Sequence, residues 1–68
     1  MKTVDGYLSR LAQEVYRDAV VYQEEAGGRK RYILERRGEE PVGLGETFRD
    51  AKTAVQALRR SGRTHGTA

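Results

Sequence analysis

The stretch from residue 43 to residue 58 constrains the fold most strongly, because it joins three local signals in immediate succession. Gly43 and Gly45 permit the close backbone approach or positive φ that a tight turn after a strand requires. Thr47 then suits a helix N-cap, with Asp50 at the third helical position in a variant of the capping box. The sequence therefore predicts a strand end, a turn and a capped helix.

The helix that Thr47 begins has an amphipathic pattern. Its apolar residues recur at helical spacing and predict one buried stripe: Phe48, Ala51, Val55 and Leu58. Arg49 and Lys52 lie off that stripe near the N-terminus of the helix, where side chains and free N–H groups can meet phosphates. The alternative for these two residues is the solvated face of an ordinary surface helix. Residues 61–68 are small and polar, and we expect them to form a flexible tail.

A second helix is predicted near the start of the chain. Its apolar residues lie on one helical face: Leu8, Leu11, Ala12, Val15 and Ala19. Asp5 can cap this helix by accepting from the N–H groups of its first turn, so that Gly6 and Tyr7 are its first helical residues.

The end of this helix has two interpretations. No glycine or proline lies between residues 7 and 26, so a single long helix could run to Gly27. The other interpretation ends the helix near Arg17 and begins a strand at residue 20, because Val20, Val21 and Tyr22 are typical strand residues. We favour the strand, since Glu24 and Glu25 would then lie across a glycine turn from basic residues.

The middle of the chain predicts two more strands. Residues 30–36 have an aromatic and aliphatic centre with charged ends, and residues 41–45 form a short return strand after a turn. We expect Tyr32 and Leu34 to face the helices, although the alternation alone also fits the reverse, with Ile33 on the helix side. The predicted fold is a two-layer α+β domain over residues 1–60, with the order helix, three antiparallel strands, helix. The alternative is a long first helix, a β-hairpin and a second helix.

The charge distribution points to a polyanionic partner. The formal net charge is +3, but residues 1–28 hold three basic and five acidic residues, whereas residues 29–68 hold ten basic and five acidic residues. A basic half of this kind is the electrostatic footprint of a nucleic-acid-binding protein. The candidate phosphate contacts are Arg29, Lys30, Arg31, Arg49 and Lys52. For the first three, pairing with nearby glutamates is the competing interpretation.

Catalysis and cofactor binding have little support in the sequence. The chain has no cysteine, and its single histidine, His65, lies in the expected tail. Ser9 and Ser61 have no recognisable base partner, and adjacent glutamates in a strand point to opposite faces. We therefore expect a non-enzymatic protein without a metal or cofactor. The absence of cysteine fits a reducing, cytoplasmic compartment, and the longest apolar run, residues 19–22, predicts no membrane span.

The order of elements and the second-helix segment resemble the double-stranded RNA-binding domain. The matching residues of that segment are Gly43, Gly45, Thr47, Arg49, Ala51, Lys52, Ala54 and Leu58. Residues 8–13 also look like the first helix of that family. Phe48 stands where the family has the first of two lysines, and residues 26–29 lack its loop histidine. The resemblance covers most of residues 5–60 and implies one face that contacts duplex backbone phosphates, with Arg49 and Lys52 among the contacts.

Two further similarities leave the function open. Residues 20–60 are similar to DNA-binding domains that read DNA with a three-stranded sheet, and the end of the chain is similar to that of small phage proteins. The alternative function is therefore a phage or mobile-element accessory protein that binds and modulates a host protein. The small core is also compatible with a homodimer.

Overall fold

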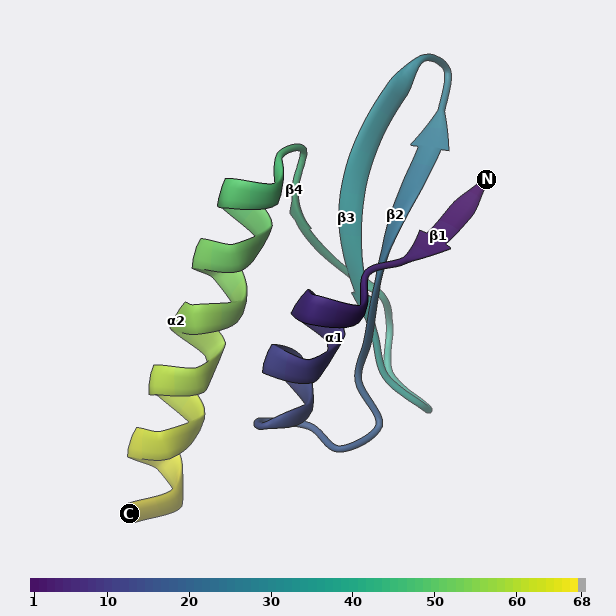
Figure 1. The fold of residues 1–68 in the computed structure, drawn as a ribbon. Helices are drawn as coiled ribbons and strands as arrows, with labels where there is room; N and C mark the ends of the chain where they lie inside the picture. The colour runs from purple at the N-terminus through teal and green to yellow at the C-terminus, as the bar shows by residue number, and fades with distance from the viewer. Residues whose placement is uncertain (68) are drawn as a thin grey trace.

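The chain folds into a sheet with two helices on one of its sides (Figure 1). The structure is a computed structural model that describes the backbone of residues 1–67 and the side chains of residues 1–61. Its elements are β1 (Lys2–Val4), α1 (Gly6–Gln13), β2 (Val20–Ala26), β3 (Arg29–Glu35), β4 (Val42–Gly45) and α2 (Phe48–Thr67). The strands of this described part form an antiparallel sheet in the order β1-β2-β3-β4. The predicted two-layer α+β class is confirmed.

The sheet has one strand more than the sequence predicts. β1 pairs with the outer edge of β2, with Val4 opposite Tyr22, and the Met1 carbonyl accepts from the Glu25 N–H at 3.0 Å. All three residues of β1 are exposed, so no apolar alternation marks it as a strand. Its formation follows from the backbone instead, because the outer edge of β2 offers hydrogen-bonding groups that need partners.

Residues 20–26 form a strand, which excludes the long first helix. The preceding helix α1 ends at Gln13, four residues earlier than the predicted end near Arg17. The Gln13 side-chain amide donates to the Ala19 carbonyl at 3.0 Å and closes the connection to β2. At the start of α1, the predicted cap is confirmed, since the Asp5 carboxylate accepts from the Leu8 N–H at 2.8 Å.

The core lies between the helices and the sheet. Its buried residues are Leu8, Ala12, Ala19, Val21, Tyr32, Leu34, Leu44, Ala51 and Val55. Tyr32 and Leu34 face the helices, as predicted, and Ile33 points to the other side of the sheet. α1 packs on β2, α2 packs on β4, and the two helices contact each other. Residues from every element except β1 therefore build the core.

A buried serine of α1 supplies hydrogen bonds to the edge of β2 just beyond the end of β1. The Ser9 hydroxyl accepts from the Val21 N–H at 2.8 Å and donates to the Val21 carbonyl at 3.1 Å. The same carbonyl also accepts from the Asp5 N–H at 2.8 Å. Buried backbone groups are rarely left without partners. Ser9 of α1 thus satisfies the backbone groups of Val21 at the edge of the sheet. The sequence did not predict this role of Ser9.

The turn between β4 and α2 has the features predicted for it. Gly45 has φ +129°, and a Cβ at this position would lie 2.6 Å from the Cβ of Asp50. Thr47 caps the helix, because its Oγ1 accepts from the Asp50 N–H at 3.1 Å. The tail was predicted to begin at residue 61, but the backbone of α2 continues to Thr67; the side chains of residues 62–68 lie outside the described part of the structure.

Candidate nucleic-acid interface

The β2–β3 hairpin carries three of the candidate residues beyond the helices. Gly27 and Gly28, with φ of 60° and 76°, form the two-residue turn, and Figure 1 shows this turn projecting past the N-terminal ends of α1 and α2. The register places Arg31 opposite Glu24, Lys30 opposite Glu25 and Arg29 opposite Ala26. The predicted placement of glutamates opposite basic residues is therefore present for Arg31 and Lys30, but among the described residues only Arg31 forms an ion pair across the hairpin.

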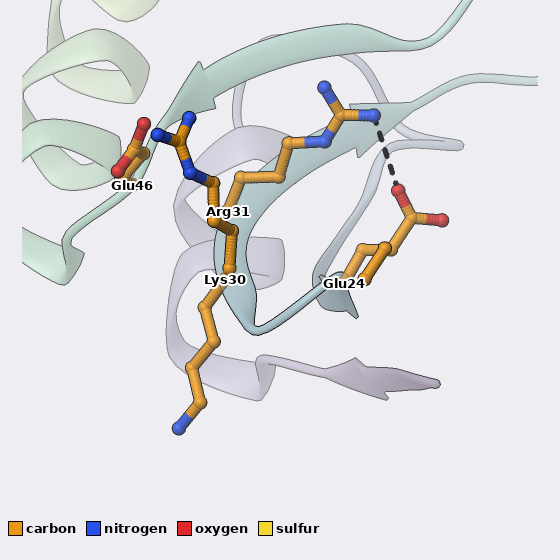
Figure 2. Close-up of a pocket in the computed structure, with 6 residues that line it drawn as sticks. Glu24, Lys30, Arg31 and Glu46 are labelled. Atoms are coloured by element: carbon orange, nitrogen blue, oxygen red, sulfur yellow. Dashed lines mark hydrogen bonds and ion pairs between the residues drawn. The ribbon is translucent and has the colours of Figure 1, made fainter.

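Arg29 and Arg31 lie on the face of the sheet that the helices leave open, because they alternate with Tyr32 and its helix-facing neighbours. They line a shallow groove with a volume of about 210 Å³, together with Glu24, Ala26, Lys30 and Glu46. Arg31 pairs with Glu24 at 3.4 Å, as Figure 2 shows. The two carboxylates at this groove offset much of its positive charge.

The Lys30 side chain lies on a different face of the sheet from the side chains of Arg29 and Arg31. Lys30 is one of the residues that line the groove, but Figure 2 shows its side chain pointing away from Arg31 and Glu46. Alternation along β3 places Lys30 on the same sheet face as Tyr32, two residues away, which is the face that carries the helices. The three consecutive basic residues therefore serve two different surfaces.

An aromatic cluster lies where the two helices begin. The ring centroids of Tyr7 and Phe48 are 5.8 Å apart with an interplanar angle of 34°, and Phe48 meets Tyr32 edge-on at 6.3 Å. The prediction that Phe48 belongs to the buried stripe is wrong, because its side chain is 42% exposed. It is the first residue of α2 and caps the end of the core beside Tyr7, which is 52% exposed.

One candidate cation, Lys52, contacts these rings, and a second, Arg49, lies near it on the same helix. The Lys52 Nζ lies 5.6 Å from the centroid of the Tyr7 ring, within the range of a cation–π contact. Arg49 is exposed, and it lies three residues before Lys52 on the surface of the same helix. We call Tyr7, Phe48, Arg49 and Lys52 the aromatic–basic patch. Its two aromatic members were not among the predicted site residues.

Several other basic residues have structural partners instead. Arg59 of α2 pairs with Glu14 at 2.8 Å and joins the two helices. Arg36 stacks on Tyr16, with its guanidinium carbon 3.7 Å from the ring centroid, and it approaches Asp18 at 4.0 Å. These contacts lie away from the hairpin turn, so Arg36 and Arg59 contribute to the fold and are not candidates for ligand contact. The five candidate cations lie on the hairpin and near the start of α2, away from these structural contacts.

The signal that could have located the aromatic pair is weak. Tyr7 directly precedes the apolar stripe of α1, and Phe48 directly follows the Thr47 cap of α2. Each position is compatible with burial as well as with exposure. Which one applies depends on how the two helices pack, and that is a tertiary property.

Comparisons with protein-family models, with curated proteins and with solved structures gave no match. No helix within the described residues is long and apolar enough to cross a membrane. In that same part of the chain, no three histidine or carboxylate side chains gather closely enough to hold a metal ion.

Proposed function

We propose that this chain is a small, non-enzymatic nucleic-acid-binding protein that contacts the backbone phosphates of a duplex. The observation that carries the proposal is the set of cations at the helix beginnings and the hairpin. Among the described residues, the Lys30, Arg49 and Lys52 side chains form no ion pair, and Lys52 makes a cation–π contact with the Tyr7 ring. Cations without carboxylate partners can be offered to phosphates at little cost.

The five candidate residues contribute unequally to this proposal. Lys30, Arg49 and Lys52 lie on the helix-bearing side and act as the principal phosphate contacts. Arg29 and Arg31 lie on the other side of the sheet beside Glu24 and Glu46, so they serve as secondary contacts. The order of α1, three strands and α2, with both helices on one face, also agrees with the resemblance to the double-stranded RNA-binding domain.

The salt dependence of binding follows from the number of phosphates contacted. Three contacts give a slope of log K against log salt of about −2.7 for duplex DNA. Raising the salt from about 50 to about 200 mM should then weaken binding roughly 40-fold. With Arg49 and Lys52 reversed, one principal contact remains, and the same change in salt should weaken binding only about 3- to 4-fold.

The test is fluorescence anisotropy with labelled double-stranded RNA, double-stranded DNA and single strands across a salt series. The variant is Arg49→Glu with Lys52→Glu. Its matched control is Arg17→Glu with Arg37→Glu, in loops that meet at Asp18, at the far end of the sheet from the hairpin turn. Both double variants replace two cations by two anions and so lower the formal net charge from +3 by four units.

The two double variants should behave differently. We expect the Arg49 and Lys52 variant to bind the duplex much more weakly at low salt, with the shallow salt dependence given above, and the control to retain most of the wild-type affinity. The proposal fails if neither duplex binds at low salt, or if the two variants weaken binding equally. In the second case, overall charge and not a defined surface would account for the affinity.

The second candidate function is an accessory protein that binds a host protein. The exposed pair of Tyr7 and Phe48 favours it, because aromatic side chains are enriched where protein partners meet. A stoichiometric protein complex that resists high salt, together with no binding to any nucleic acid, would support this candidate. Loss of that complex in Phe48→Ala would identify the surface.

A further inference from the structure

The phosphate contacts proposed above make no use of the two most exposed aromatic rings of the helix layer. About half of Tyr7 and more than a third of Phe48 remain in contact with solvent, although both rings are apolar and adjoin the core. Leaving this much aromatic surface in water is unfavourable by itself. A ligand that covers the rings would regain that stabilisation.

The surroundings of the rings indicate what such a ligand is. Lys52 lies 5.6 Å from the Tyr7 ring centroid, and Arg49 follows Phe48 directly in the chain. A ligand that has an aromatic ring with a negatively charged group next to it suits this arrangement. A nucleotide has both properties, since its base offers a π-face and its phosphate lies a few ångströms from the base. A purely apolar partner would leave the two cations without a role.

The geometry of the pair suits stacking at its solvent side. Phe48 is held from behind by the edge-on contact with Tyr32, whose hydroxyl accepts from the Gln23 side-chain amide at 3.3 Å. Tyr7 is fixed at the start of α1, two residues after the Asp5 cap. The two rings therefore hold their orientation before a ligand arrives, which lowers the entropic cost of binding.

We propose that Tyr7 and Phe48 form a stacking platform for an unpaired base next to the duplex that the cations contact. The favoured ligand is then a duplex with a single-stranded overhang. This inference rests on the proposed function, because the same Arg49 and Lys52 supply the phosphate contacts. A base inside an intact duplex has both faces covered by its neighbours and cannot reach the platform.

The expected gain follows from the stacking of one base on an aromatic side chain. Such a contact changes affinity on the order of 5- to 150-fold. Because the two rings already contact each other and are only partly exposed, we expect a gain near the lower end of that range, about 5- to 10-fold. The gain should be insensitive to salt, since it adds no phosphate contact.

The experiment compares a blunt duplex, the same duplex with a short overhang, and the single strand alone. The overhang carries 2-aminopurine, whose fluorescence falls when it stacks on an aromatic ring. The test variant is Tyr7→Leu with Phe48→Leu, which keeps apolar cover over Tyr32. The matched control is Tyr16→Leu, which removes a tyrosine at the far end of the sheet. Circular dichroism of each variant confirms that it is folded.

The wild type should bind the overhang duplex more tightly than the blunt one and quench the 2-aminopurine. The Tyr7 and Phe48 variant should bind both duplexes equally without quenching, whereas Tyr16→Leu should behave as the wild type. Equal binding of blunt and overhang duplexes by the wild type overturns the stacking platform but leaves the phosphate-binding function intact. Absence of binding to all three ligands overturns the proposed function itself.

Discussion

Replacing Ser9 by alanine removes the hydroxyl that serves Val21 where β1 leaves the sheet. The Val21 carbonyl keeps the Asp5 N–H as its donor, but the Val21 N–H loses its acceptor. Ser9 is 5% exposed and Val21 is fully buried, so water has little access to the abandoned group. The substitution therefore isolates one buried, unsatisfied backbone donor.

The cost can be worked out from the two effects of the substitution. A buried donor without a partner destabilises the fold by about 1–3 kcal/mol. Alanine has a higher helix propensity than serine, which offsets roughly 0.5 kcal/mol of this loss in stability. The net loss of about 1.5 kcal/mol is large for a 68-residue chain, whose total stability is on the order of 3–10 kcal/mol. It corresponds to a fall in melting temperature of about 6–12 °C.

Thermal and urea unfolding followed by far-ultraviolet circular dichroism measure this loss. Ser61→Ala is the matched control, because it makes the same chemical change at an exposed position of α2 and carries a similar gain in helix propensity. Hydrogen exchange should also show reduced protection of the Val21 amide in the Ser9 variant. The reasoning is refuted if Ser9→Ala and Ser61→Ala have the same stability.

Two further substitutions test other parts of the fold. Gly45→Ala should destabilise the domain by about 1–3 kcal/mol, because φ is +129° and the new Cβ would overlap Asp50. Gly43→Ala is the control, since a Cβ at Gly43 meets nothing within 4 Å. Equal unfolding midpoints for the two variants would contradict this prediction. Glu14→Gln should cost only about 0.2–1 kcal/mol, since the ion pair with Arg59 is partly exposed, and urea titrations should show that this difference shrinks in high salt.

The parts of the fold that the sequence predicts well are those encoded by neighbouring residues. The Asp5 and Thr47 caps and the Gly27–Gly28 turn each depend on a few consecutive positions. Local chemistry decides these features before any tertiary contact forms. For that reason the fold class followed from the sequence even though no apolar run in the chain is long.

The features that the sequence did not predict depend on contacts between residues that are far apart in the chain. β1 exists because the edge of β2 needs a partner, and Ser9 is buried because Val21 lies 12 positions further along the chain. The candidate site shows the same limit. The basic residues could be named from the charge pattern, but their division between two faces required the hairpin register. The exposure of Phe48 required the packing of α1 against α2.

The order of the strands has a consequence for how the chain reaches its fold. Among β2, β3 and β4, each strand pairs with the next one in sequence, whereas β1 pairs with β2 across helix α1. The β2–β3 hairpin closes through two glycines and can form first, with β4 and then α2 added from the adjacent chain. Topologies with such short sequence separations fold rapidly, because little chain entropy is lost before contacts compensate for it. The β2–β3 hairpin, with its two-residue turn, thus requires the shortest loop closure in the sheet.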